Sequence, residues 1–194
     1  MTLAPWRSPL AHALHRSRRR REARYFQLAT VDGDGFPHNR TVVFRGFVND
    51  TNSLKIITDR RSAKIEHLRH HPHGAICWYF SESREQWRFQ GKIQLITDTE
   101  TDASLCQDRQ QIWQSLSDDA RVQFAWPSPA SPRPDITQAV EVDAPDPLTP
   151  LSTFYLLYFH PHQVSHLELQ GNPQYLTRYC LDEDQSWQKQ DLFP

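Results

Sequence analysis

One short segment carries most of the residue types that bind an anionic group. Residues 58–64, with the sequence TDRRSAK, follow the apolar run at 53–58 and precede residues at helical spacing. A helix N-terminus offers free backbone N–H groups and the positive end of the helix dipole, and this segment adds arginines, a hydroxyl and a lysine. The segment predicts a phosphate site. The alternative is that Ser62 only caps the helix while the cations are solvated.

Two other segments alternate cations or amides with large apolar residues. Residues 40–45 (RTVVFR) begin and end with arginine, and residues 84–92 (REQWRFQGK) place polar groups along a second run. Such alternation is unusual in a strand that only packs, and it predicts a site for a flat, polar-edged, phosphorylated ligand. The alternative is charge pairing with acidic residues across a solvated sheet face.

Antiparallel strands are the elements that must position these segments. Runs rich in β-branched and aromatic residues occupy residues 25–31, 41–48, 53–58, 74–80 and 86–97, and the turn sequence DGDG separates the first two. Four more strands are predicted after residue 151, at 152–161, 164–170, 175–181 and from 187 to the end. Strands joined by short turns, without regular alternation with helices, indicate an antiparallel barrel or sandwich.

Three helices and one long loop complete the predicted organisation. The first helix starts at Ser8-Pro9, and the second starts near Ser62 and stops at Pro72. Thr99 and Asp102 resemble a capping box for a third helix, which ends before Pro127. Residues 126–150 contain seven prolines, which remove amide donors and predict an extended loop.

Charge and composition exclude several classes of protein. The chain has 194 residues, with 22 Lys+Arg against 23 Asp+Glu, which fits a single domain and argues against a general nucleic-acid binder. The basic residues at 16–24 are interpreted as a solvated helix face or a subunit contact, with polyanion binding as the alternative. No apolar run approaches the roughly 18 residues of a membrane span, so a cytoplasmic protein is expected.

The histidine clusters do not predict a metal site. His70, His71 and His73 lie around Pro72, and residues 160–162 read HPH, but no carboxylate or cysteine stands nearby at ligand spacing. We interpret these histidines as surface or turn residues.

Taken in order, these segments resemble the FMN-binding split-barrel family typified by pyridoxamine 5'-phosphate oxidase. The resemblance implies a mainly β fold with flanking helices, a six-stranded antiparallel split β-barrel, over residues 1–194 as a single domain. It also implies a homodimer with FMN at the subunit interface. The implied cofactor-binding residues are Arg40, Thr41, Val42, Val43, Ile57, Thr58, Ser62, Lys64 and Gln86.

The chain departs from the oxidase pattern at two places. Ala63 stands where the oxidase has a phosphate-binding arginine, and Arg61 is expected to supply that guanidinium instead. The R-x-H-x-R element that serves the oxidase's substrate falls on Pro173, Tyr175 and Thr177, which leaves Arg45 and Arg178 as the substrate-binding candidates. The motif F-x-W-P at residues 124–127 more closely resembles a branch of the family found in cyanobacteria and plants.

An FMN-dependent oxidoreductase with a small-molecule substrate is therefore the predicted function. No histidine or carboxylate stands out in the sequence as a general base. Two alternatives stay open: a flavin- or haem-binding carrier or sensor without turnover, in which His70, His71 or His73 would bind the haem, and a polyanion-binding protein that uses residues 16–24.

Overall fold

One antiparallel sheet organises the protein. The computed structural model describes residues 3–133 and 142–194, so residues 134–141 of the predicted proline-rich loop lie outside the described residues. The elements are, in chain order, α1 (Arg7–Arg16), the 3₁₀ turn η1 (Arg21–Arg24), β1 (Tyr25–Val31), β2 (Pro37–Val43), β3 (Leu54–Asp59), α2 (Ala63–His70), β4 (His73–Phe80), β5 (Glu85–Ile96), α3 (Ala103–Gln114), α4 (Asp118–Val122), β6 (Phe154–Glu168), β7 (Tyr175–Leu181) and β8 (Trp187–Leu192).

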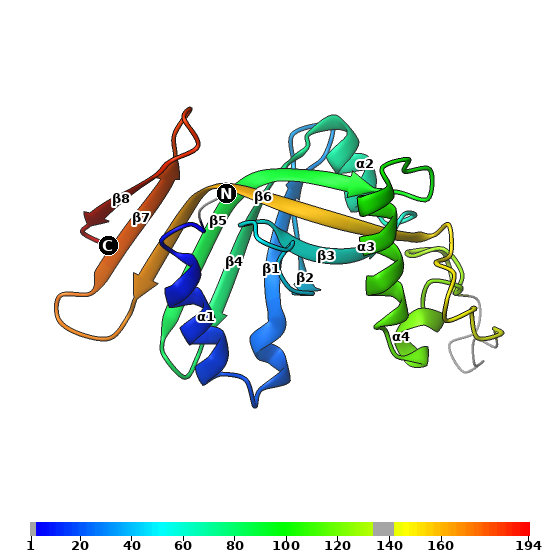
Figure 1. The fold of residues 1–194 in the computed structure, drawn as a ribbon, viewed down its shortest axis with the longest axis horizontal. Helices are drawn as coiled ribbons and strands as arrows, with labels where there is room; N and C mark the ends of the chain where they lie inside the picture. Colours follow the sequence, from blue (N-terminus) through cyan, green and yellow to red (C-terminus); the bar gives the residue numbers. More distant parts are fainter. Residues whose placement is uncertain (1–2, 134–141) are drawn as a thin grey trace.

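The strand order confirms the predicted mainly β, antiparallel architecture. The sheet runs β2-β1-β4-β5-β6-β7-β8, and β3 pairs with β6 off this path, so it holds eight strands where six were expected. The hairpin β7–β8 extends the sheet at one end of the molecule, and α3 and α4 lie at the other end (Figure 1). No ladder joins β2 to β3 in the described part of the chain, which leaves the sheet split between these two strands.

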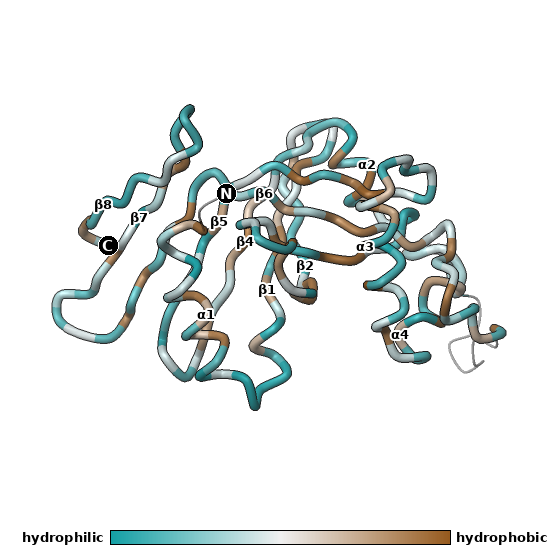
Figure 2. The backbone as a smooth tube through the Cα atoms, in the orientation of Figure 1, coloured by the Kyte–Doolittle hydropathy of each residue, from teal (hydrophilic) through white to brown (hydrophobic). Residues whose placement is uncertain are grey.

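The core lies against one face of the sheet. Along β5 the odd-numbered residues from Glu85 to Ile93 are buried, while Arg88 and Gln90 between them are exposed. Apolar stretches gather where β3, β5 and β6 cross the middle of the molecule (Figure 2). Strand alternation therefore gives an inner face that is packed and an outer face that carries polar side chains. The inner face holds most of the large buried aromatics, namely Trp6, Phe26, Trp78, Trp87 and Phe89.

A single strand replaces two that were predicted. Residues 152–161 and 164–170 were expected as separate strands around the sequence HPH, but β6 runs through it without a break. Gln90 pairs with Gln163 and Gly91 pairs with Pro161, so one extra residue on β6 forms a bulge. Pro161 is tolerated inside β6 because a bulge interrupts the ladder where proline has no N–H to donate.

The helices differ from prediction mainly at their ends. Ser62 is the N-cap residue of α2, as expected, whereas Asp102 itself caps α3 by accepting from the backbone N–H groups of Ser104 and Leu105 at 2.8 and 3.1 Å. The third predicted helix is two helices, α3 and α4, and α1 begins at Arg7, with Pro9 in its first turn. None of the described helices is long and apolar enough to cross a membrane.

Part of the basic N-terminal cluster is used within the protein. Arg16 at the end of α1 contacts the buried carboxylate of Glu85, which His166 also contacts at 2.8 Å. The His166 ring stacks on Trp87 with 3.8 Å between centroids. Arg20 pairs with Glu82 at 2.7 Å. These contacts fasten α1 and the following turn to the β4–β5 hairpin, so they favour the interpretation of residues 16–24 as a packed or solvated surface.

We expect Gly91→Ala to destabilise the fold. A Cβ at this position would overlap the His160 carbonyl oxygen, which belongs to the backbone of β6, and would lie 2.7 Å from the Phe159 ring. Overpacking of this kind costs about 2 kcal/mol or more in free energy of unfolding. Gly33→Ala is the matched control, because its Cβ would meet only a His70 side-chain atom at 3.8 Å. Urea unfolding that gave the two variants equal midpoints would contradict the close approach at Gly91.

Candidate functional site

The open edge of β2 faces the open edge of β3 at the split. Residue 45 donates its backbone N–H to the Lys55 carbonyl at 3.0 Å, and Phe47 forms an isolated bridge with Leu54. These bonds lie where the chain leaves β2 and enters β3. The predicted cofactor-binding residues Arg40, Thr41, Val42, Val43, Ile57 and Thr58 lie on these two strands, and the edges that β2 and β3 turn away from β1 and β6 have no ladder partner among the described residues.

Arg40 lies on the inner face and is held by β1. It pairs in register with Leu28, and its Nη1 donates to the Leu28 carbonyl at 3.1 Å and to Thr30 Oγ1 at 2.7 Å. No carboxylate contacts Arg40 in the described residues. Burial lowers the pKa of its guanidinium from the ordinary value, which shows that water compensates its charge only partly.

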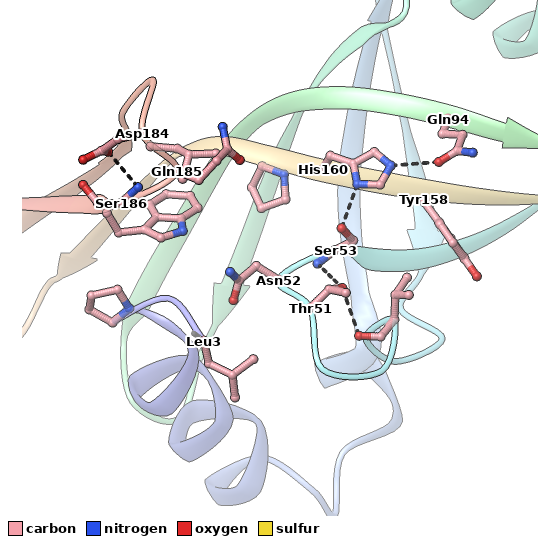
Figure 3. Close-up of a pocket in the computed structure, with 15 residues that line it drawn as sticks. Leu3, Thr51, Asn52, Ser53, Gln94, Tyr158, His160, Asp184, Gln185 and Ser186 are labelled. Atoms are coloured by element: carbon pink, nitrogen blue, oxygen red, sulfur yellow. Dashed lines mark hydrogen bonds between the residues drawn. The ribbon is translucent and has the colours of Figure 1, made fainter. Parts of the chain in front are cut away.

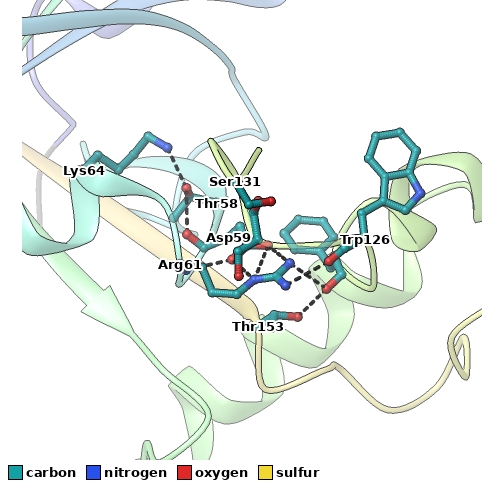
Figure 4. Close-up of polar contacts among 9 residues, drawn as sticks. Thr58, Asp59, Arg61, Lys64, Trp126, Ser131 and Thr153 are labelled. Carbon is teal, nitrogen blue, oxygen red and sulfur yellow. Dashed lines mark hydrogen bonds and ion pairs between the residues drawn. The ribbon is translucent and has the colours of Figure 1, made fainter. Parts of the chain in front are cut away.

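Lys64 is a second cation without a carboxylate partner in the described part of the chain. Its Nζ donates to Ser62 Oγ at 2.6 Å. It also donates to Thr58 Oγ1 at 2.9 Å (Figure 4). Burial, assisted by the charge of Arg40, lowers the pKa of Lys64 from 10.5 to about 8, and Asp59 opposes this shift only in part. Ser62 makes no side-chain cap bond and instead faces the lysine. Two partly buried cations beside a helix N-terminus form a site that an anion would stabilise.

Arg61 has other partners. Its Nε and Nη2 contact the Asp59 carboxylate at 2.9 and 2.6 Å, which raises its pKa. Nη1 donates to the Trp126 carbonyl at 2.9 Å and Nη2 to the Phe124 carbonyl at 3.3 Å. In Figure 4 the guanidinium lies among these groups, while the Lys64 amine points to Thr58. Arg61 therefore connects the end of β3 to the start of the proline-rich segment through these hydrogen bonds.

A histidine pair behind Arg40 was not found by the sequence reasoning. Thr30 Oγ1 accepts from Arg40, so its hydroxyl hydrogen is directed to Nδ1 of His67 at 3.0 Å. The rings of His67 and His38 are 4.6 Å apart, and His38 Nε2 contacts Asp32 at 2.8 Å. Burial and the neighbouring cationic groups lower the pKa of His67, which keeps it neutral as an acceptor. The sequence carries two signals for this pair. His67 follows Lys64 at helical spacing, and His38 precedes Arg40 by two residues, which places both on one face of a strand.

Gln86 lies on the opposite face of the sheet from Arg40. The registers connect Arg40 with Leu28, Ile76 and Phe89 on the inner face, whereas Gln86 lies one residue from the buried Trp87 and points outward. A single chain therefore does not bring Gln86 to the residues at the split.

The two substrate-binding candidates also lie apart from each other. Arg178 shares the outer face, because it pairs with Ser165, which pairs with Arg88. Arg45 lies at the end of the split where the chain pairs with Lys55, and burial lowers its pKa. The Nε atoms of both arginines are buried without a hydrogen-bond partner.

A pocket of about 840 Å³ lies elsewhere in the molecule. It is bounded by the start of α1, the turn at 51–53, the middle of β6 and the β7–β8 turn (Figure 3). Within it His160 contacts Ser53 Oγ at 2.7 Å and Gln94 Oε1 at 3.1 Å. None of its lining residues is a predicted cofactor-binding residue, so we assign the candidate site by its charges and hydrogen bonds and not by cavity size.

The other histidines and acids form no metal centre among the residues described. No group of three or more potential metal ligands converges there. His70 contacts Glu66 on the exposed face of α2 at 2.9 Å, and His71 and His73 are exposed.

Comparison with known proteins decides the family. A protein of Arabidopsis thaliana named pyridoxine/pyridoxamine 5'-phosphate oxidase 2 is 36% identical over 170 residues, which cover 88% of this chain and 86% of that protein. The chain belongs to the pyridoxamine 5'-phosphate oxidase family. Residues 3–97 match the model of that family's FMN-binding domain, which confirms FMN as the cofactor.

Solved structures of this family agree with the fold. A crystal structure from Nostoc punctiforme, described as a pyridoxamine 5'-phosphate oxidase-related FMN binding protein, is 48% identical, has a TM-score of 0.95, and both chains are covered completely. PhzG from Burkholderia lata has a TM-score of 0.73 at 19% identity, with 98% of this chain and 93% of that chain covered, and shows the shared fold. These matches confirm the predicted split barrel.

The titration of Lys64 predicts how affinity for FMN depends on pH. A bound phosphate raises the pKa of Lys64, so affinity is full while the free lysine is charged, below about pH 8, and falls as pH rises above that value. Below about pH 6 the phosphate itself takes up a proton and affinity declines again. Lys64→Arg, which stays charged, is expected to show no fall between pH 8 and 10. If fluorescence titrations gave the wild type and Lys64→Arg the same dependence of FMN affinity on pH, Lys64 would not be a phosphate ligand.

Proposed function

We propose that this protein is an FMN-dependent oxidoreductase that acts on a small-molecule substrate. The observation that carries the proposal is the pair Arg40 and Lys64. Both are partly buried cations without a carboxylate partner in the described residues. Lys64 lies where the end of β3 meets the N-terminus of α2, and Arg40 on β2 is close enough for its charge to lower the pKa of Lys64. A dianionic phosphate supplies the charge that this arrangement lacks.

Each residue at the split has a role in the proposed complex. Lys64, Ser62 and Thr58 bind the phosphate, while Arg40 and the backbone of residues 41–43 hold the polar parts of the cofactor along the free edge of β2, opposite Ile57. Arg61 does not contact the phosphate in this proposal; it positions the site by holding Asp59 and the segment at 124–126 in place. The bound flavin supplies the electron-transfer chemistry, and the protein supplies the binding and orientation.

A homodimer completes the proposed site. Gln86 and the residues at the split lie on opposite faces of one sheet, so both can contact one FMN only if Gln86 comes from a second copy. The outer face of β1, β4 and β5 carries half-exposed apolar rings, including Tyr25 and Tyr79, that a partner would cover. A two-fold axis would then form two equivalent sites.

The alternative within the same fold is a flavin carrier without turnover. Pro173, Tyr175 and Thr177 support it, because they cannot supply the arginine and histidine that the oxidase pattern places there. Anaerobic mixing of the FMN-loaded protein with pyridoxamine 5'-phosphate, pyridoxine 5'-phosphate and other phosphorylated heteroaromatic amines and alcohols distinguishes an oxidoreductase from a carrier. Bleaching of the flavin absorbance by any of them supports an oxidoreductase, and no bleaching by any supports the carrier.

We expect Lys64→Ala to weaken FMN binding more than Arg61→Ala does. Loss of a charge-assisted bond to phosphate raises the FMN dissociation constant by roughly tenfold to a hundredfold. Arg61→Ala is expected to raise it less, because Arg61 acts through Asp59. Lys189→Ala, which removes an exposed lysine of β8, is the control. The measurement is titration of the apoprotein followed by flavin fluorescence, and a wild-type protein that stays colourless after addition of FMN would contradict the proposal.

Mixed dimers test the shared site. Lys64→Ala and Gln86→Ala each damage both sites of a homodimer, but a dimer with one chain of each kind has one site with both residues intact. Unfolding and refolding the two variants together is therefore expected to recover tight FMN binding in about one quarter of all sites, given random pairing. Refolding each variant alone is the control. Absence of any tight sites in the mixture would mean that the two residues do not meet across an interface.

A further inference from the structure

A buried threonine and a buried histidine connect the two cations of the candidate site. Thr30 on β1 lies diagonally opposite Arg40 on β2 and accepts from its Nη1 at 2.7 Å. Helix α2 packs against β1, and its buried side carries His67, whose Nδ1 lies 3.0 Å from Thr30 Oγ1. Lys64 precedes His67 by about one turn of this helix. Hydrogen bonds through Thr30 therefore connect Arg40 to the helix that carries Lys64.

The direction of these bonds follows from the donors and acceptors present. Arg40 can only donate, so Thr30 Oγ1 accepts from it and directs its single hydrogen to another acceptor. That acceptor is Nδ1 of His67, which must be unprotonated there, so the ring carries its hydrogen on Nε2. The orientation of the Thr30 hydroxyl thus depends on a neutral histidine in one tautomer.

The surroundings of His67 keep its ring neutral. Burial lowers its pKa most, and the charges of three neighbouring groups lower it further, namely His38, Arg40 and Lys64. Asp32 opposes this shift, but its carboxylate contacts His38 at 2.8 Å. A charged ring would donate from both nitrogens and would leave the buried Thr30 hydroxyl hydrogen without an acceptor.

The burial of this pair argues against a role in packing alone. Thr30 is 1% exposed and His67 is 7% exposed. Burying polar side chains costs free energy that their hydrogen bonds offset, whereas apolar side chains of similar size would pack without that cost. The bonds do fix Nη1 of Arg40, for which the Leu28 carbonyl at 3.1 Å is the other acceptor. Nε and Nη2 of Arg40 make no hydrogen bond to the described residues, so these donors are available to a ligand.

We propose that Thr30 and His67 are positioning residues for FMN binding. Neither contacts the cofactor in this proposal. They hold the Arg40 guanidinium in one orientation, so that its free donors are directed at the ligand before FMN binds. An arginine that is already ordered loses less conformational entropy when the ligand arrives, which raises the affinity. The inference rests on the role of Arg40 in the proposed function and adds the residues that fix its geometry.

Two substitutions at residue 30 separate positioning from packing. Thr30→Val keeps the shape of the side chain and removes the hydroxyl, so it is expected to raise the FMN dissociation constant by roughly threefold to tenfold. Thr30→Ser keeps the hydroxyl and removes the buried methyl group, and it is expected to stay within about twofold of the wild type. A packing role predicts the reverse order, because serine leaves a cavity and valine does not. The measurement is titration of each apoprotein with FMN, followed by flavin fluorescence.

The matched changes at residue 67 are His67→Leu and His67→Asn. Asparagine carries its side-chain oxygen near the position of Nδ1 and can accept from Thr30, whereas leucine has no acceptor. His67→Leu is therefore expected to raise the FMN dissociation constant by roughly threefold to tenfold, and His67→Asn to keep it within about twofold. His70→Leu, an exposed change on the same helix, is the control and is expected to leave the affinity unchanged. Equal affinities of the leucine and asparagine variants at residue 67 would contradict the positioning role.

A double-mutant cycle tests whether the effect passes through Arg40. Arg40→Ala alone is expected to raise the FMN dissociation constant by roughly tenfold or more, because it removes a charge-assisted contact. In the Arg40→Ala protein Thr30→Val has no guanidinium to release, so it is expected to change the constant there by less than about twofold. If Thr30→Val weakened binding equally in both backgrounds, Thr30 would not act by positioning Arg40.

The wild-type protein provides a test that does not depend on the folding of any variant. Long-range proton–nitrogen NMR spectra of the FMN-loaded protein at neutral pH report which ring nitrogen of each histidine carries hydrogen. For His67 they are expected to show a protonated Nε2 and an unprotonated Nδ1. A charged ring, or a ring with its hydrogen on Nδ1, would overturn the proposal.

Failure of this inference is distinguishable from failure of the proposed function. If Arg40→Ala weakens FMN binding but Thr30→Val and His67→Leu bind FMN as the wild type does, the positioning role is wrong and the proposed function stands. If Arg40→Ala itself binds FMN normally, the role of Arg40 in the proposed function is wrong, and the inference falls with it. A wild-type protein that binds no FMN overturns both.

Discussion

The site is organised by positive charge that the protein only partly solvates. Arg40 and Lys64 are held near each other by bonds to uncharged oxygens, namely a carbonyl and three hydroxyls, and these bonds orient the cations without neutralising them. Partial burial removes water that would otherwise compensate the charge, and it therefore lowers the pKa of both groups. If only stability mattered, a carboxylate beside Arg40 or Lys64 would neutralise the charge, as Asp59 does beside Arg61.

The sheet makes this arrangement possible because it is left unclosed. β3 pairs with β6 and β2 pairs with β1. Among the described residues, backbone bonds join this side of the sheet only between residues 45–48, just after β2, and residues 53–55 at the start of β3. The continuous strand β6 pairs with both β3 and β5. The bulge in β6 opposite Gly91 bends the strand, so that its two halves pair with parts of the sheet that run in different directions. The aromatic core on the inner face holds this backbone, while the split keeps two strand edges available for a ligand.

The same alternation that builds the core separates the functional residues into two sets. Arg40 and Lys64 belong to the inner side and the split, whereas Gln86 and Arg178 belong to the outer face. Strand alternation in the sequence indicates that residues 86 and 87 point to opposite faces, but only the strand registers show that Arg40 shares its face with residue 87 and not with Gln86. The proposed FMN site needs both sets, so the proposal requires that it form between two copies of the chain.

Local patterns in the sequence were enough to predict most of the strands and the helix that starts after Ser62, because strand alternation, caps and turns depend on near neighbours. The grouping of residues 40–43 with 57–64 in one site came from the resemblance to the family. The sequence could not show that the HPH motif lies inside one bulged strand, that Arg61 is occupied by Asp59 and two carbonyls, or that His38 and His67 stand behind Arg40. Apart from the local contact of Arg61 with Asp59, these features depend on contacts between residues far apart in the sequence, such as Arg61 with Trp126 and Gln90 with Gln163, and only the packed sheet brings such residues together.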